Sequence, residues 1–485
     1  MLKQSPSLQD EFSPALHFRA PFGWINDPNG LVFADGLWHL FYQFHPMSTV
    51  WGPMYWGHAV SEDLLHWKNM PVALAPDALG NIFSGSCVVD ARNDSGMFTA
   101  PSDGNLLAFY TSALPQSDGR PDYQTQSIAS SENGGTTWTK WPGNPVIANP
   151  GLECFRDPKV FWFAPGKYWV MLLTHGQSVG IYRSKDLRNW DLASEFGEGE
   201  GHHSPGPWEC PDLFELKSSS GESRWVLVVG VGDGCPAPGS GTQYFIGRFD
   251  GTCFVNESAP DRVRWLDLGR DHYATQSWFA APQGRRVAIA WMSNWRYARN
   301  TSTRFFRGVM TLPRDLYLGS DAMGDHFVGQ RFSEELNGAF DTPPIEMCVG
   351  DSYPAPATIR VRGKMSFRVG DTLRIRLFDD DHDQIRIERS EHGYAVMLVR
   401  RVHSDDETLS REFPHQYDVP LLLRDDVLDL DMIVDAGTVE LLLDGGRYSI
   451  TQLFFPRSVA GALRLEGSAS GRIALCESVK ERCDV

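Results

Sequence analysis

Short stretches rich in β-branched and aromatic residues dominate the first two-thirds of the chain and set the limits on its fold. Each stretch lies between residues 31 and 316 and is bounded by Gly, Pro, Asn or Asp, as is typical of strands separated by turns. Stretches of ten or more residues with helical periodicity are nearly absent. The sequence therefore predicts an all-β protein. Examples of such strands are Leu37–Tyr42, Val160–Phe163, Tyr168–Leu173, Trp225–Val229 and Val287–Trp291.

A repeat indicates how these strands are arranged. The run Ser61–Trp67 (SEDLLHW) recurs as Ser184–Trp190 (SKDLRNW) and, more loosely, as Ser131–Trp138 (SENGGTTW), each time after a strand-like segment. Successive blades of a β-propeller need such a turn with Asp or Asn, followed by Trp on the next strand. Generic hairpin turns could give the same pattern. We favour a propeller with blades of unequal length.

The pattern changes after about Asp341. Thr342–Pro344 interrupts the chain, and Thr372–Leu377 and Val439–Gly446 then alternate cleanly, as half-buried antiparallel strands do. Regularly spaced short strands of this kind favour a β-sandwich of about 130 residues. We predict two domains, a propeller over residues 1–335 and a sandwich over residues 336–485, with a short helical linker around residues 333–340.

The charge of the chain excludes some classes of partner. Its 61 acidic and 44 basic residues give a net charge of −17, which repels phosphate backbones and anionic lipids, so we expect neither nucleic acid nor membrane as a partner. No apolar run is long enough for a transmembrane helix, and the start lacks a signal-peptide pattern. The eight cysteines contain no C-x-x-C pair and are expected to be reduced thiols. The expected location is the cytoplasm, or outside the cell if a leader has been removed; the oligomeric state stays open.

Three acidic segments stand out because their carboxylates have unusual neighbours. They are Trp24–Gly30 (WINDPNG), Phe155–Lys159 (FRDPK) and Trp208–Phe214 (WECPDLF). Taken singly, the first could be an ordinary turn capped by its Asp, the second an ion pair at the start of a strand, and the third a loop with a partly exposed Glu.

Taken together, the three segments resemble the signature motifs of glycoside hydrolase family 32, the β-fructosidases: invertases, levanases, inulinases and related fructosyltransferases. The resemblance is dense from about residue 17 to residue 316. Two departures are Ile25 in place of the usual Met and His272 in place of the usual aromatic residue. Further matches occur in the family's order at Phe41–Gln43, Trp51–Met54, Trp56–His58, Phe83–Ser86, Gly241–Phe245, Trp291–Met292 and Arg307–Arg314.

The resemblance implies a five-bladed propeller followed by a β-sandwich, with a funnel-shaped active site at the propeller axis. It also implies that Asp27 is the nucleophile, that Glu209 is the general acid and base, and that Asp157 stabilises the transition state. A retaining glycosidase needs the first two carboxyl groups about 5–5.5 Å apart. We expect Arg156 to hold the adjacent Asp157 ionised, because an opposite charge favours the charged form.

Sugar recognition needs hydrogen-bonding groups and an aromatic wall. By resemblance, Asn26, Gln43, Ser84 and Arg156 form the polar set around the reacting sugar, Trp51, Phe83 and Trp291 form the wall, and Tyr273 binds substrate. The implied chemistry requires no cofactor and no metal. The expected activity is hydrolysis of terminal β-fructofuranosyl units of sucrose, levan or inulin.

Two other functions remain open. A fructosyltransferase uses the same covalent intermediate, and a non-catalytic fructan-binding protein would keep the pocket. The second is disfavoured because all three carboxylates are present. The sequence does not decide between sucrose, levan and inulin, or between β-2,1 and β-2,6 linkages.

Overall fold

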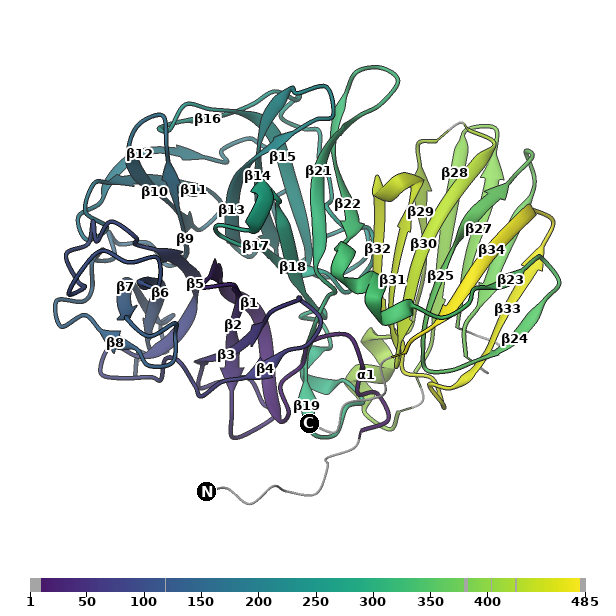
Figure 1. Cartoon of the computed structure of the whole chain (residues 1–485), viewed down its shortest axis with the longest axis horizontal. Coiled ribbons are helices and arrows are strands. Elements are labelled where there is room, and N and C mark those ends of the chain that lie inside the picture. Colours follow the sequence, from purple (N-terminus) through teal and green to yellow (C-terminus); the bar gives the residue numbers. More distant parts are fainter. Residues whose placement is uncertain (1–9, 118, 379–382, 403, 424, 480–485) are drawn as a thin grey trace.

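The structure, a computed structural model, describes residues 10–479 except 118, 379–382, 403 and 424. Seven sheets, antiparallel except for one short parallel pair, account for most of these residues, and the one α-helix among them is the short α1 (Glu407–Glu412). Five sheets form a propeller, at the left of Figure 1, and two form a sandwich at the right. The predicted all-β class, with a propeller followed by a sandwich, is confirmed.

Each blade of the propeller runs outward from an innermost strand. Blade 1 contains β1 (Gly23–Ala34), β2 (Leu37–His45), β3 (Tyr55–Ser61) and β4 (Lys68–Asn69), and blade 2 contains β5 (Asn81–Val89), β6 (Leu106–Leu114), β7 (Tyr123–Ser131) and β8 (Thr139–Lys140). Blade 3 contains β9 (Phe155–Phe163), β10 (Tyr168–His175), β11 (Val179–Ser184) and β12 (Asp191–Phe196), and blade 4 contains β13 (Trp208–Lys217), β14 (Ser223–Val231), β15 (Gly241–Phe249) and β16 (Phe254–Asn256). Blade 5 contains β17 (Tyr273–Ser277), β18 (Val287–Met292), β21 (Arg314–Ser320) and β22 (His326–Phe332), with β20 (Val309–Met310) beside β18.

The sequence repeat is the turn between the third and fourth strands of blades 1, 2 and 3. Its Asp accepts a hydrogen bond from a backbone N–H three residues later, over 2.8 Å from His66 to Asp63 and over 2.8 Å from Asn189 to Asp186. The residue after the Asp or Asn has φ near 60° in all three copies, at Leu64, Gly134 and Leu187. The repeat therefore marks equivalent positions in three blades.

A short strand from the end of the propeller closes the ring. β19 (Phe306–Arg307) pairs in parallel with the start of β1, where Gly23 lies opposite Phe306 and Trp24 opposite Arg307. Because β19 follows β18 of blade 5 in the chain, this pairing, which we call the clasp, joins the last blade to the first.

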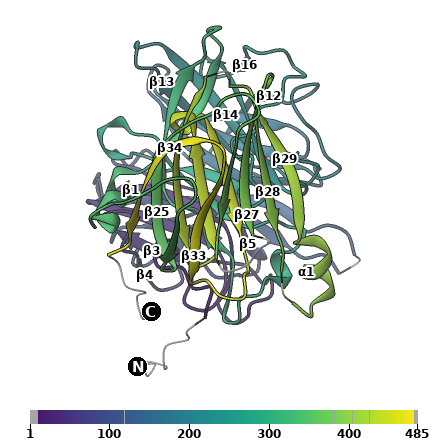
Figure 2. The ribbon, with the colours of Figure 1, turned by 90° about the vertical axis from the view of Figure 1, so that its right-hand side faces the viewer.

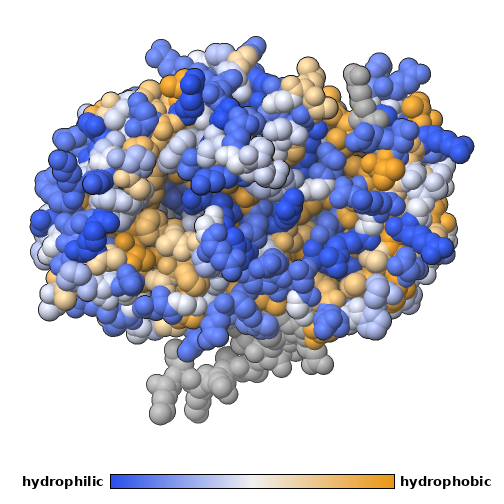
Figure 3. All heavy atoms as spheres, turned by 45° about the horizontal axis from the view of Figure 1, so that its top comes forward, coloured by the Kyte–Doolittle hydropathy of each residue, from blue (hydrophilic) through white to orange (hydrophobic). Residues whose placement is uncertain are grey.

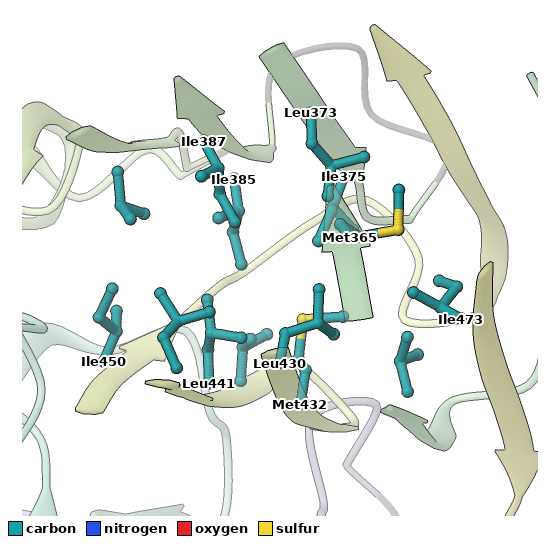
Figure 4. Packing of buried hydrophobic residues seen from close by; sticks show 14 of the residues in the cluster. Met365, Leu373, Ile375, Ile385, Ile387, Leu430, Met432, Leu441, Ile450 and Ile473 are labelled. Carbon is teal, nitrogen blue, oxygen red and sulfur yellow. The ribbon is translucent and has the colours of Figure 1, made fainter. Parts of the chain in front are cut away.

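The sandwich consists of two six-stranded sheets that face each other (Figure 2). Leu373, Ile375, Ile385 and Ile387 of one sheet point toward Leu430, Met432, Leu441 and Ile450 of the other, as alternation along the strands predicts (Figure 4). One sheet contains β23 (Ile345–Met347), β34 (Ser470–Glu477), β25 (Thr358–Ser366), β30 (Val427–Asp435), β31 (Thr438–Leu443) and β32 (Tyr448–Leu453). The other contains β24 (Ser352–Ala355), β33 (Gly461–Gly467), β26 (Thr372–Arg376), β27 (Gln384–Ser390), β28 (Gly393–Arg400) and β29 (His415–Leu421). The predicted helical linker is the 3-10 helix η3 (Glu334–Phe340), and the predicted domain boundary at 335/336 falls inside it.

Buried charges hold the sandwich against the propeller. The Arg314 guanidinium on β21 donates to Glu440 on β31, and its Nη1 lies 3.2 Å from Asp267. His17, which precedes β1, contacts Asp435 and the same Glu440, each over 2.9 Å. A buried charge without its partner is costly, so these groups fix how the two parts meet.

Candidate active site

The innermost strands of the five blades gather around the centre of the propeller (Figure 1), and each is bulged at its start. The register shifts on β1, β5, β13 and β17 fall between Ile25 and Pro28, Ile82 and Gly85, Glu209 and Asp212, and Tyr273 and Gln276. On β9 the shift lies between Arg156 and Lys159. A bulge changes the direction of a side chain, so five bulges at one level can direct residues of all blades toward one point.

Asp27 lies in the bulge of β1 and is held by three donors. Ser84 Oγ donates to its Oδ2 over 2.6 Å, Asn26 Nδ2 to its Oδ1 over 3.0 Å, and Cys210 Sγ lies 3.4 Å from Oδ2. Burial, helped by the charge of Glu209, raises the pKa of Asp27, while the three hydrogen bonds oppose that rise. Asn26 and Ser84, two residues of the predicted polar set, thus lie beside this carboxylate.

Asp157 lies in the bulge of β9 with φ of 63°, and it accepts a hydrogen bond from the backbone N–H of Cys210 over 2.9 Å. Burial raises the pKa of Asp157 to about 7; Arg156 opposes the shift and the charge of Glu209 adds to it. Arg156 thus acts on Asp157 in the expected direction and favours its charged form, but burial outweighs this effect on the pKa. Arg156 Nε is 4.0 Å from Asp157, whereas its Nη2 donates to Glu209 over 2.8 Å.

Glu209 has a donor on each carboxylate oxygen. Arg156 donates to Oε1, and the Tyr273 hydroxyl donates to Oε2 through a short hydrogen bond. Burial and the charge of Glu209 raise the pKa of Tyr273 well above its usual value, so the phenol keeps the proton that it donates. The structure thus brings the three predicted carboxylates together: Cys210 joins Asp27 to Asp157, and Arg156 lies between Asp157 and Glu209.

The remaining predicted residues differ in how they meet the pocket. Gln43 is buried and donates to the Ile82 carbonyl over 3.0 Å, so it supports blade 2. Trp51 and Phe83 are half-buried and meet edge to face with ring centroids 6.0 Å apart. Trp291, the third predicted wall residue, is 0% exposed, and its ring packs behind Trp51 and Phe83 in the same cluster, against Trp295 and Tyr273.

A buried network below the carboxylates escaped the sequence analysis. Lys159 Nζ lies 3.0 Å from Asp212 and 3.1 Å from Gln276 Oε1, and Gln276 Nε2 donates to the Cys210 carbonyl over 2.9 Å. Lys159 and Asp212 belong to the FRDPK and WECPDLF segments. The available signal was a second charged residue in each segment, Lys159 two residues after Asp157 and Asp212 three residues after Glu209.

The described part of the chain has neither a cluster of metal ligands nor a membrane-spanning helix. Within it, no group of three or more His, Cys, Asp or Glu side chains is placed to hold a metal ion. Among the same residues, no helix is long and apolar enough to span a membrane. The seven cysteines that the structure describes are free thiols, and Cys483 lies outside the described residues.

A propeller that gathers three carboxylates at its axis and carries a β-sandwich behind it defines a two-domain glycosidase. Residues 17–329 match the N-terminal domain of glycosyl hydrolases family 32, and residues 352–480 match the C-terminal part of the same family. The chain belongs to glycoside hydrolase family 32.

Similar proteins narrow the activity. The levanase of Bacillus subtilis is 40% identical over 481 residues, which cover 95% of this chain and 69% of that protein. The extracellular exo-inulinase of Aspergillus awamori is 34% identical over 494 residues, covering 93% and 90%. The protein is therefore a β-fructofuranosidase-type glycosidase that releases terminal fructosyl units, and the fructosyltransferase alternative is not favoured.

Solved structures agree over the whole fold. The exo-inulinase crystal structure from Aspergillus awamori has a TM-score of 0.88 at 32% identity and covers 98% of this chain and 100% of that one. The β-fructofuranosidase from Schwanniomyces occidentalis complexed with fructosyl-erythritol has a TM-score of 0.87 at 29% identity, with 98% and 100% covered.

Proposed function

We propose that the protein removes terminal fructosyl units from sucrose and from the fructans levan and inulin, with Asp27 as nucleophile, Glu209 as acid and base, and Asp157 as the stabilising third carboxylate. One observation carries the assignment of roles. Asp27 accepts hydrogen bonds from Ser84 and Asn26, which orient its carboxylate for attack, whereas each oxygen of Glu209 accepts from Arg156 or Tyr273, and these two donors hold the second carboxyl group in place.

In the first step the Asp27 carboxylate attacks C2 of the terminal fructosyl unit. The bond from C2 to the glycosidic oxygen breaks, and Glu209 gives its proton to that oxygen, so the rest of the substrate leaves as an alcohol. Asp157 accepts hydrogen bonds from sugar hydroxyls as positive charge develops on the ring. In the second step water attacks C2, Glu209 takes its proton, and Asp27 leaves as a carboxylate with the configuration at C2 retained.

The first test is Asp27→Asn. The amide keeps the size of the side chain but cannot attack C2, so kcat should fall by roughly 10³-fold or more while the unfolding temperature changes little. Glu209→Gln is the companion variant, and its residual activity should improve with substrates whose leaving group needs no proton. Near-wild-type turnover of Asp27→Asn would remove Asp27 from the nucleophile role.

The second test is a substrate panel. Sucrose, inulin and levan are incubated separately with the enzyme, and the products are identified. Free fructose released stepwise from each supports exo-hydrolysis. Oligosaccharides or a dianhydride as main products would instead indicate transfer, because a sugar hydroxyl would then have replaced water as acceptor.

A further inference from the structure

A second hollow opens on the face of the propeller that carries the carboxylates. Its volume is about 310 Å³, and its polar and aromatic lining consists of Gln116, Arg120, Asp122, Tyr123, Asn149 and Glu153. These residues come from the turn between β6 and β7 and from the segment that leads into β9. Leu114 at the end of β6 pairs with Tyr123 on β7, and Ala113 pairs with Asn81 at the start of β5. The turn therefore lies at the same end of blade 2 as Ser84.

The hollow approaches the reacting groups through Arg156. Burial raises the pKa of Asp122, and the charge of the Arg156 guanidinium opposes that rise. Next to Tyr123, Gln124 Oε1 accepts a hydrogen bond from the backbone N–H of Phe155 over 2.8 Å. Glu153, which lines the hollow on the segment that leads into β9, precedes Arg156 by three residues. Three residues of extended chain span roughly 10 Å. Arg156 in turn donates to Glu209.

The lining suits a sugar. The Tyr123 side chain is exposed (44% for the residue) and offers a flat ring for the apolar face of a sugar. Asp122 and Glu153 can accept hydrogen bonds from sugar hydroxyls, and the Gln116 amide can accept them through its oxygen. The hollow thus combines an aromatic platform with convergent polar groups, as carbohydrate sites do.

We propose that this hollow binds a fructosyl unit of a fructan chain beyond the unit that leaves in the reaction. The proposal rests on the proposed function, in which Glu209 protonates the leaving oxygen. The leaving part of the substrate must therefore lie on the Glu209–Arg156 side of C2, which is the side of the hollow. A chain of several units extends along this side to Tyr123, whereas the single leaving glucose of sucrose ends near Arg156.

The test compares kcat/KM for sucrose and for inulin-type oligosaccharides of increasing length in the wild type, Tyr123→Ala and Tyr123→Phe. In the wild type, kcat/KM should rise with chain length beyond three units. Tyr123→Ala should lose about 5- to 10-fold on the longer chains and less than about twofold on sucrose. Tyr123→Phe keeps the ring and should behave as the wild type. Glu153→Gln, on the opposite wall, is a second variant with the same expected selectivity.

The outcomes separate two kinds of failure. The hollow is not a binding site if Tyr123→Ala loses kcat/KM equally on sucrose and on long chains. The same conclusion follows if the wild-type kcat/KM does not change with chain length. Either result leaves the proposed function intact. A wild type that hydrolyses sucrose but no fructan would contradict the proposed fructan substrate and, with it, the role of the hollow.

Discussion

At the scale of single residues, Cys210 connects two of the three acids. Its backbone N–H donates to Asp157, and its thiol lies 3.4 Å from Asp27. Burial and the neighbouring carboxylates raise the pKa of the thiol well above its usual value, so it remains a neutral donor between two acids. A thiolate at this position would add a further negative charge beside the three carboxyl groups of the pocket.

The hydrogen bond from Ser84 to Asp27 leads to a prediction on pH dependence. This bond favours the carboxylate and lowers the pKa of Asp27, whose net shift is upward. Ser84→Ala removes the donor, so the pKa of Asp27 rises further. Because Asp27 must be ionised to attack, the acid limb of the pH profile of kcat/KM should move to higher pH. Ser84→Thr keeps a hydroxyl and is the control; an unmoved acid limb in Ser84→Ala would contradict the assignment.

At the scale of elements, the bulged starts of the innermost strands explain why a regular propeller can hold an irregular site. Asp157, Cys210 and Ala274 have φ of 63°, 49° and 54°, in the left-handed region that non-glycine residues rarely occupy. Such backbone persists only where its surroundings impose it. The Lys159–Gln276–Asp212 network is the surrounding that binds the Cys210 carbonyl.

The Lys159–Asp212 pair should therefore be important for stability. Lys159→Met leaves the Asp212 carboxylate buried without its cation, and we expect a loss of about 3–5 kcal/mol in the free energy of unfolding, measured with denaturant. The double variant Lys159→Met/Asp212→Asn removes both charges and should recover a large part of the loss. If the effects of the two substitutions simply add, the pair does not act as a unit.

The elements and the acids were predictable because their signals are local. Alternating apolar residues, turn residues and the Ser-x-Asp/Asn repeat each depend on a few neighbouring positions, and the acidic motifs are contiguous. The additional contact of Arg156 with Glu209 was not predicted, because Glu209 is 53 residues away and the contact depends on tertiary geometry. The burial of Trp291 depends on packing against Tyr273 and Trp295. Two of the three left-handed bulge residues, Cys210 and Ala274, are of types without a left-handed preference.

At the scale of the whole molecule, the buried contact of His17 with the sandwich joins three distant parts of the chain: the segment before β1, the end of β30 and the middle of β31. Burial alone would lower the pKa of His17, but the hydrogen bonds and charges of Asp435 and Glu440 raise it to about 9. The imidazolium is thus the cation beside Asp435, and it shares Glu440 with the Arg314 guanidinium.

This pKa predicts how stability depends on pH. Because the folded pKa of about 9 lies above the usual imidazole pKa of about 6.5, His17 stabilises the fold fully below about pH 6.5, and its contribution, about 3 kcal/mol, disappears as the pH rises to about 9. The variant His17→Gln cannot titrate. The difference in unfolding temperature between wild type and His17→Gln should therefore be largest in mild acid and should shrink toward pH 9. A difference in unfolding temperature that stays constant over this pH range would contradict the raised pKa of His17.

The clasp between β19 and β1 also has a consequence for recombination. Gly23 and Trp24, a few residues before Asp27, pair with Phe306 and Arg307. A chimaera that takes its first blade from one parent and its last blade from another therefore combines a β1 and a β19 that come from different proteins. Crossover points should therefore keep β1 and β19 from the same parent. Exchanges confined to the middle blades leave this junction untouched.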